Sequence, residues 1–167
     1  LSGEGSVTWS DGNRYEGPMI AGKKEGRGIF VWANGQRYTG DWQDDQMTGQ
    51  GILHFADGSR YEGTVLTGKR QGAGRFFWPD GQRFDGEWRN DTINGQGTMH
   101  YANGDRYEGQ FKNGEPYGVG TYTLKKGDQY TGEWVNGNKH GQGRLTWTSG
   151  DYWEGEFRDD RQTENGK

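Results

Sequence analysis

The feature that most constrains this chain is a 23-residue repeat that runs along it without insertion. Glycine recurs at four fixed places in the repeat, in series that begin at Gly3, Gly5, Gly12 and Gly17 and continue every 23 residues. Most of the 33 glycines belong to these series. Each copy of such a repeat forms one supersecondary unit that stacks on its neighbours. The period therefore predicts an array of repeats within the 167 residues.

Glycine content excludes a helical array, because each Gly inside a helix costs about 1 kcal/mol relative to Ala. The chain is poor in aliphatic residues but contains 8 Trp, 9 Tyr and 7 Phe, and its net charge is only −4. Disordered chains are poor in aromatic residues and carry a high net charge. We therefore expect a folded chain whose core is built from aromatic rings.

Aromatic and apolar residues follow the same period in four series, named here by their first members. The Val7 series is Val7, Phe30, Leu53, Phe76, Met99, Tyr122 and Leu145, and the Trp9 series is Trp9, Trp32, Phe55, Trp78, Tyr101, Leu124 and Trp147. The Tyr15 series is Tyr15, Tyr38, Tyr61, Phe84, Tyr107, Tyr130 and Trp153, and the Met19 series is Met19, Trp42, Val65, Trp88, Phe111, Trp134 and Phe157. Two alternating runs flank a turn that ends in glycine, which predicts one β-hairpin per repeat.

The hairpin loop fixes a register. If residues 10–12 form a three-residue loop with a type I turn and a left-handed glycine, Val7 faces Tyr15 and Gly5 faces Gly17. The apolar residues and the glycines outside the turn then share one face. The glycines are expected to leave notches for large rings, which explains why they recur within strands.

The opposite face provides a check on this register. It places Arg27 opposite Asp41 and Arg144 opposite Glu154. Opposite charges that face each other across strands stabilise a sheet, so these pairs support the predicted pairing.

The predicted fold is all-β: an elongated antiparallel meander of seven stacked β-hairpins, forming a single-layer twisted sheet with an aromatic groove. One array is expected over residues 1–167. Its repeats are 3–25, 26–48, 49–71, 72–94, 95–117, 118–140 and 141–163, and residues 164–167 begin a truncated eighth unit.

Several segments carry a family resemblance. Tyr38–Trp42 reads Tyr-Thr-Gly-Asp-Trp, Phe84–Trp88 reads Phe-Asp-Gly-Glu-Trp, and Tyr130–Trp134 reads Tyr-Thr-Gly-Glu-Trp, each with Gly-x-Gly and a turn glycine at fixed offsets. The chain resembles MORN (membrane occupation and recognition nexus) repeats from residue 3 to residue 163. The resemblance implies a non-catalytic scaffold or docking module, often membrane-associated, with protein binding and a proposed phospholipid binding.

No constellation of catalytic or metal-ligating residues stands out from the repeat. The chain has no cysteine, and His54 and His100 are two repeats apart, so we expect neither a metal nor a cofactor. Carboxylates fall mostly at repeat positions, which favours a solvated ladder over an acid–base pair. We therefore expect no enzyme activity. With 24 acidic and 20 basic residues, no nucleic-acid partner is expected.

The leading functional hypothesis is a docking module that binds a protein segment in the aromatic groove or along the sheet edges, because exposed apolar grooves mark interaction sites. The expected partner-groove residues are Trp42, Trp88, Phe111, Trp134, Trp32 and Trp78.

Other roles remain open beside this one. An arginine ladder on the polar face could follow anionic phospholipid headgroups, although each arginine is followed two residues later by Glu, Thr or Asp. The ladder is Arg14, Arg37, Arg60, Arg83 and Arg106. Trp and Tyr platforms could bind a carbohydrate or a choline-type ligand. The array could be the targeting arm of a larger enzyme, and unpaired sheet ends could give an end-to-end homodimer.

Overall fold

The structure is a computed structural model that describes residues 2–163, and every regular element within them is a β-strand. The first eight strands are β1 (Gly3–Thr8), β2 (Arg14–Ile20), β3 (Lys23–Lys24), β4 (Gly26–Val31), β5 (Arg37–Gln43), β6 (Gln46–His54), β7 (Arg60–Leu66) and β8 (Lys69–Phe77). The next eight are β9 (Arg83–Arg89), β10 (Thr92–His100), β11 (Arg106–Lys112), β12 (Glu115–Thr123), β13 (Gln129–Val135), β14 (Asn138–Thr146), β15 (Tyr152–Arg158) and β16 (Arg161–Gln162).

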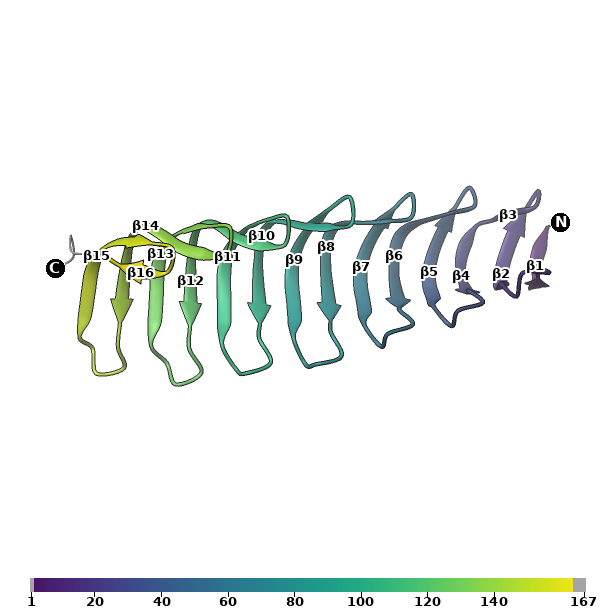
Figure 1. The fold of residues 1–167 in the computed structure, drawn as a ribbon. Helices are drawn as coiled ribbons and strands as arrows, with labels where there is room; N and C mark the ends of the chain where they lie inside the picture. Colours follow the sequence, from purple (N-terminus) through teal and green to yellow (C-terminus); the bar gives the residue numbers. More distant parts are fainter. Residues whose placement is uncertain (1, 164–167) are drawn as a thin grey trace. The chain divides into compact units, whose positions relative to one another are not determined.

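Strands follow chain order in an open antiparallel meander, which confirms the predicted fold class (Figure 1). The chain divides into two compact units. Unit 1 comprises residues 1–79 with 88–91, and unit 2 comprises residues 80–87 with 92–167. The truncated eighth repeat expected at residues 164–167 lies outside the described residues.

The hairpin within each repeat has the predicted three-residue turn and register. Val7 pairs with Tyr15 and Gly5 with Gly17. The Gly12 N–H donates to the Trp9 carbonyl at 3.0 Å, and Gly12 adopts φ 95°, a left-handed conformation that glycine tolerates. This turn therefore sets the register that places the four aromatic and apolar series on one face.

Both charge pairs expected from the register are present. Arg27 pairs with Asp41 across β4 and β5, with 3.2 Å between Nη1 and Oδ1. Arg144 pairs with Glu154 across β14 and β15, with 2.8 Å between Nε and Oε1. These ion pairs are exposed, so each contributes little to stability and serves mainly as a marker of register.

A second kind of turn joins successive repeats and was not predicted. It has two central residues with positive φ, as at Asp44 (52°) and Asp45 (70°), which is typical of a type I′ hairpin. The two kinds of turn lie at opposite ends of the strands (Figure 1). Pairing across this second turn shifts register between Gly40 and Trp42, so a bulge accompanies it. Strands such as β6 therefore continue from one turn to the other.

Tyrosine rings lie across the strand glycines, as the notch prediction requires. The Tyr15 hydroxyl donates to the Pro18 carbonyl at 2.9 Å, which holds the ring along its own strand. A Cβ added to Gly28 would fall within the Tyr15 ring. Gly40 also has no space for a side chain, because its Cβ would lie 2.5 Å from the Gln50 carbonyl oxygen. The glycines are thus needed for ring packing.

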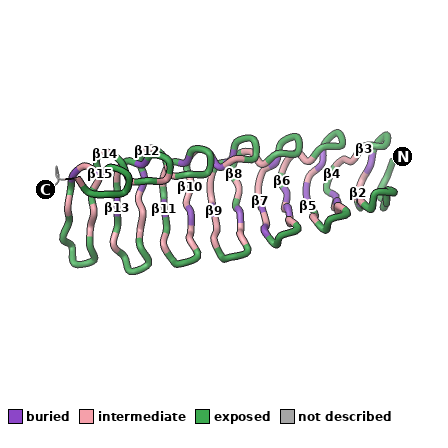
Figure 2. The backbone as a smooth tube through the Cα atoms, viewed as in Figure 1, coloured by how far each residue is buried: buried purple, intermediate pink, exposed green. Residues whose placement is uncertain are grey.

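Burial is concentrated within the strands, and the turns are exposed (Figure 2). Five members of the Tyr15 series, Tyr15, Tyr38, Tyr61, Phe84 and Tyr107, have no accessible surface. The core is therefore a line of rings on one face of each unit.

Burial of these phenols predicts alkaline sensitivity. Burial raises the pKa of Tyr38, Tyr61, Tyr107 and Tyr130 to about 12. The unfolded pKa is about 10. Their contribution to stability is thus complete below pH 10 and is lost as the pH rises through 12. Urea unfolding at pH 9 to 12 should show a falling free energy of unfolding, with a smaller decline in Tyr38→Phe. A free energy that stays constant over this range would contradict the assignment.

Candidate functional site

The inner rings of the aromatic face are core residues. Trp42, Trp88, Phe111 and Trp134 are only 4–6% exposed. The Trp42 indole donates to the Gly28 carbonyl at 3.2 Å, and the Trp134 indole donates likewise to the Gly120 carbonyl at 3.2 Å. In the free chain these four rings are therefore buried, because their bulk packs against neighbouring rings and backbone, and their role as partner-groove residues stays a prediction.

A side chain just after each inter-repeat turn occupies one repeat position, and in unit 1 two such side chains lie over these rings. We call these the cover residues: Lys24, Met47, Arg70, Ile93, Pro116 and Lys139. The Lys24 ammonium lies 5.0 Å from the Trp42 ring centroid. The Arg70 guanidinium lies 4.7 Å from the Trp88 centroid. A single-layer sheet thus closes much of its aromatic face with its own side chains.

Basic cover residues are paired with an aspartate 21 residues later. Lys24 Nζ lies 2.6 Å from Asp45 Oδ1, and Arg70 Nε lies 3.0 Å from Asp91 Oδ1. Where glycine replaces the aspartate, as at Gly68, the cover residue is apolar, here Met47, whose carbonyl accepts the Gly68 N–H at 3.0 Å. In the sequence this arrangement appears as a correlation between two positions 21 residues apart: a basic cover residue goes with aspartate, and an apolar cover residue goes with glycine.

On the aromatic face, the exposed large side chains belong to the Trp9 series, beside the three-residue turns. We call this series the turn-end stripe. Trp9, Leu124 and Trp147 are 36–40% exposed, and Trp32 and Trp78 are half-buried. In unit 1 the stripe rings rest on the Val7 series, with 4.7 Å between the Trp32 and Phe30 centroids. Packing of this kind fixes the orientation of the accessible rings.

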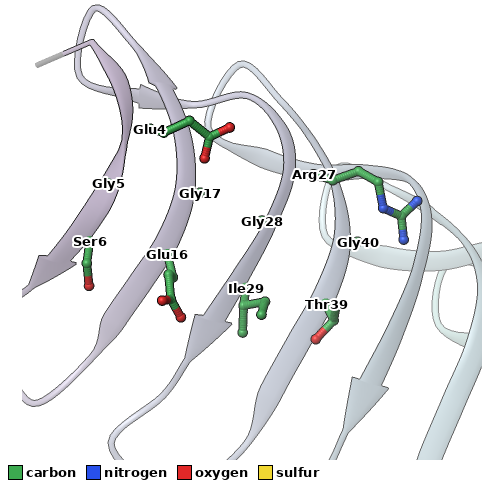
Figure 3. A pocket seen from close by; sticks show the side chains of 10 residues that line it. All are labelled: Glu4, Gly5, Ser6, Glu16, Gly17, Arg27, Gly28, Ile29, Thr39 and Gly40. Carbon is green, nitrogen blue, oxygen red and sulfur yellow. The ribbon is translucent and has the colours of Figure 1, made fainter.

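The opposite face of unit 1 carries an open hollow of about 620 Å³. Figure 3 shows Glu4, Ser6, Glu16, Arg27, Ile29 and Thr39 around a row of glycines, Gly5, Gly17, Gly28 and Gly40. The four glycines line this hollow with their backbone atoms. Sequence reasoning assigned these glycines only to the aromatic face and missed the hollow.

The arginine ladder is partly neutralised. Arg60 pairs with Glu62 at 3.1 Å, Arg83 with Asp85 at 3.5 Å and Arg106 with Glu108 at 2.7 Å. The two remaining members, Arg14 and Arg37, make no ion pair with the described residues. They line a hollow of about 470 Å³ that also contains His54. Burial and the nearby Arg37 charge lower the pKa of His54.

Metal-binding and membrane-spanning features were also sought. Across residues 2–163, no group of three or more His, Asp or Glu side chains is arranged to hold a metal ion. The same residues include no helix long and apolar enough to cross a bilayer. His100 lies 3.0 Å from the Arg83 guanidinium, through Nε2, so its ring belongs to the ladder on the polar face.

Tandem hairpins with stacked rings define the chain as a β-hairpin repeat protein. The MORN repeat family model matches seven consecutive segments: residues 1–14, 15–37, 38–60, 61–83, 84–106, 107–129 and 130–152. The chain therefore belongs to the MORN repeat family. A comparison with curated protein sequences found no match.

Solved structures share the fold at low sequence identity. One is the TCP domain of SAS-4 (dCPAP) of Drosophila melanogaster, solved with a proline-rich motif of Ana2 (dSTIL). It is 12% identical, with coverage of 92% of this chain and 83% of that chain and a TM-score of 0.57. Another is the G-box domain of the microcephaly protein CPAP, which is 14% identical, with coverage of 99% and 98% and a TM-score of 0.51.

Proposed function

We propose that this chain is a non-catalytic docking module that binds a protein segment along the turn-end stripe of unit 1. The observation that carries the proposal is the row of accessible rings, Trp9, Trp32, Phe55 and Trp78, at one repeated position. Aromatic anchors dominate binding energy at protein interfaces. Their half-buried setting holds the rings in place and reduces the entropy lost on binding.

The solved neighbour adds support for an extended partner. That SAS-4 domain was solved in complex with a proline-rich motif. Extended proline-rich segments dock on rows of aromatic rings because the free segment is already ordered. Regularly spaced rings such as Trp32 and Phe55 suit a segment of this kind. A scaffold role follows, in which the array positions a bound segment without chemistry of its own.

The choline-type alternative is weakened by the cover residues. A quaternary amine would need an open cage of rings. Lys24 occupies such a cage in unit 1, within 5.9 Å of the Trp9, Tyr15, Phe30 and Trp42 centroids. We therefore favour the protein segment. The targeting arm of a larger enzyme and the end-to-end homodimer stay predictions.

Phospholipid binding is not part of the proposal. Three ladder arginines are paired with carboxylates, and the net charge of −4 opposes attraction to an anionic bilayer. Any lipid contact by the ladder would fall to Arg14 and Arg37.

The proposal is tested by selecting binding peptides from a displayed library on residues 1–167 and measuring their affinity for variants. Trp32→Ala and Trp78→Ala should each weaken binding at least tenfold, as loss of an aromatic anchor does. Arg60→Ala on the polar face is the matched control and should change affinity less than twofold. Circular dichroism checks that each variant is folded. Equal losses in all three variants would place the binding surface elsewhere.

A further inference from the structure

Unit 2 contains a cavity of about 260 Å³ on its aromatic face. Its walls are mainly Tyr122, Leu124, Tyr130, Leu145, Trp147 and the cover residue Lys139. The rim carries Lys126 and Asp128, whose side chains form an ion pair at 2.9 Å. Lys126 is therefore paired, and the other cation that lines the cavity is Lys139, whose ammonium lies farther from its carboxylate, 3.9 Å from Asp160.

The corresponding site in unit 1 shows what is missing. Five repeats earlier, Leu124 corresponds to Trp9 and Leu145 corresponds to Phe30. These two rings stack with 5.8 Å between their centroids. Replacing an indole and a phenyl ring by two leucines removes ring volume from the same wall. The cavity of unit 2 borders these two leucines, and the ring of Tyr122 stands where unit 1 has Val7.

The two lysines reflect this difference. The Lys24 ammonium lies 5.0–5.9 Å from four ring centroids. The Lys139 ammonium lies 5.7 Å from the Tyr130 centroid, and among the described residues no second ring makes a cation–π contact with it. Lys24 Nζ lies 2.6 Å from its aspartate, and Lys139 Nζ lies 3.9 Å from Asp160. The Lys139 side chain is 26% exposed against 12% for Lys24. Lys139 therefore has room beside it for an aromatic ring of the kind that already surrounds Lys24.

We propose that this cavity receives an aromatic side chain, Trp or Phe, from a bound protein segment. The ring would lie against Leu124 and Leu145 and present its face to the Lys139 ammonium, which attracts the ring quadrupole. An aliphatic side chain would fill the space but gain nothing from the cation. The inference rests on the proposed function, since it names an anchor of the partner segment.

The test uses free probes, so it does not depend on the stripe in unit 1. N-acetyl-tryptophanamide and N-acetyl-leucinamide are titrated into residues 1–167 while the leucine methyl signals are followed by NMR. The tryptophan amide should shift the Leu124 and Leu145 methyls saturably, and the leucine amide should bind at least tenfold more weakly. Equal responses to the two amides, or no shift at these methyls, would overturn the proposal.

Variants distinguish binding in the cavity from nonspecific binding elsewhere on the protein. Leu145→Phe restores the residue type found at Phe30, so it should fill the site, keep the fold and weaken the tryptophan amide at least tenfold. Leu66→Phe makes the same change at an exposed leucine in unit 1 and should leave affinity within twofold. Lys139→Met should weaken the tryptophan amide at least threefold but leave the leucine amide unchanged. Unaltered binding in Leu145→Phe would overturn the assignment.

Failure of this test and failure of the proposed function are distinguishable. If the amides do not bind in unit 2 but displayed peptides still depend on Trp32 and Trp78, the docking role stands and the cavity assignment is wrong. If the amides bind as expected while peptide affinity is unchanged in both tryptophan variants, the cavity assignment stands and the turn-end stripe is not the docking surface.

Discussion

Replacing Trp42 by alanine should lower the free energy of unfolding by about 3–5 kcal/mol, the usual cost of deleting a buried aromatic side chain. The Trp42 ring meets three others, with centroid distances of 5.6 Å to Tyr15, 5.9 Å to Phe30 and 5.4 Å to Tyr38. Its removal also exposes the stem of Lys24. Urea unfolding followed by tryptophan fluorescence and circular dichroism measures the loss.

Trp147→Ala provides the matched control. This indole is 40% exposed and belongs to the turn-end stripe, so its removal should cost less than about 1 kcal/mol, as expected for an exposed position. If the two variants were equally destabilised, the division between core rings and accessible rings would be wrong.

Replacing Gly28 by alanine should cost about 3 kcal/mol, the upper end of the range for overpacking a core. The added methyl group would occupy the space of the Tyr15 ring, whose hydroxyl is tied to the Pro18 carbonyl. Either the ring leaves its notch and loses this hydrogen bond or β2 and β4 separate. Thermal and urea unfolding report the change.

Gly5 occupies the same repeat position as Gly28 and is the control. A Cβ at Gly5 meets nothing within 4 Å, because no tyrosine lies across it. Gly5→Ala should therefore leave stability within about 0.5 kcal/mol, as usual for a surface substitution. A similar loss in both variants would show that backbone freedom, and not ring packing, explains the strand glycines.

Much of the fold could be predicted because its determinants are residue types that repeat. The turn glycine at Gly12 fixes the loop, and the loop fixes the strand register. Apolar residues that alternate along each strand, such as Val7 and its partner Tyr15, then fix which face of the sheet is buried. The notch role of Gly28 followed from the same register. Each of these signals concerns residues close in sequence whose chemistry is the same in every copy.

The accessible surface could not be predicted in the same way. The cover position holds Lys24, Met47, Arg70, Ile93 and Pro116 in successive repeats, so it shows no constant chemistry, and its effect appears only when the next repeat is stacked on it. Without knowledge of this position, the sequence predicts that the four inner rings are available to a partner. Trp32 and Trp78 stay predicted partner-groove residues, and the cavity beside Lys139 depends on the residues at two positions that lie in different repeats.

The 21-residue coupling between cover residues and turn aspartates makes the repeats unequal as building blocks. Removing one repeat, residues 25–47, would bring Gly68 to the place that Asp45 holds beside Lys24. The half-enclosed ammonium of Lys24 would then lack a counter-charge. Removing two repeats, residues 25–70, would instead bring Asp91 to Lys24 and keep the pair. Shortening this segment of the array in steps of two preserves a charge balance that single steps break.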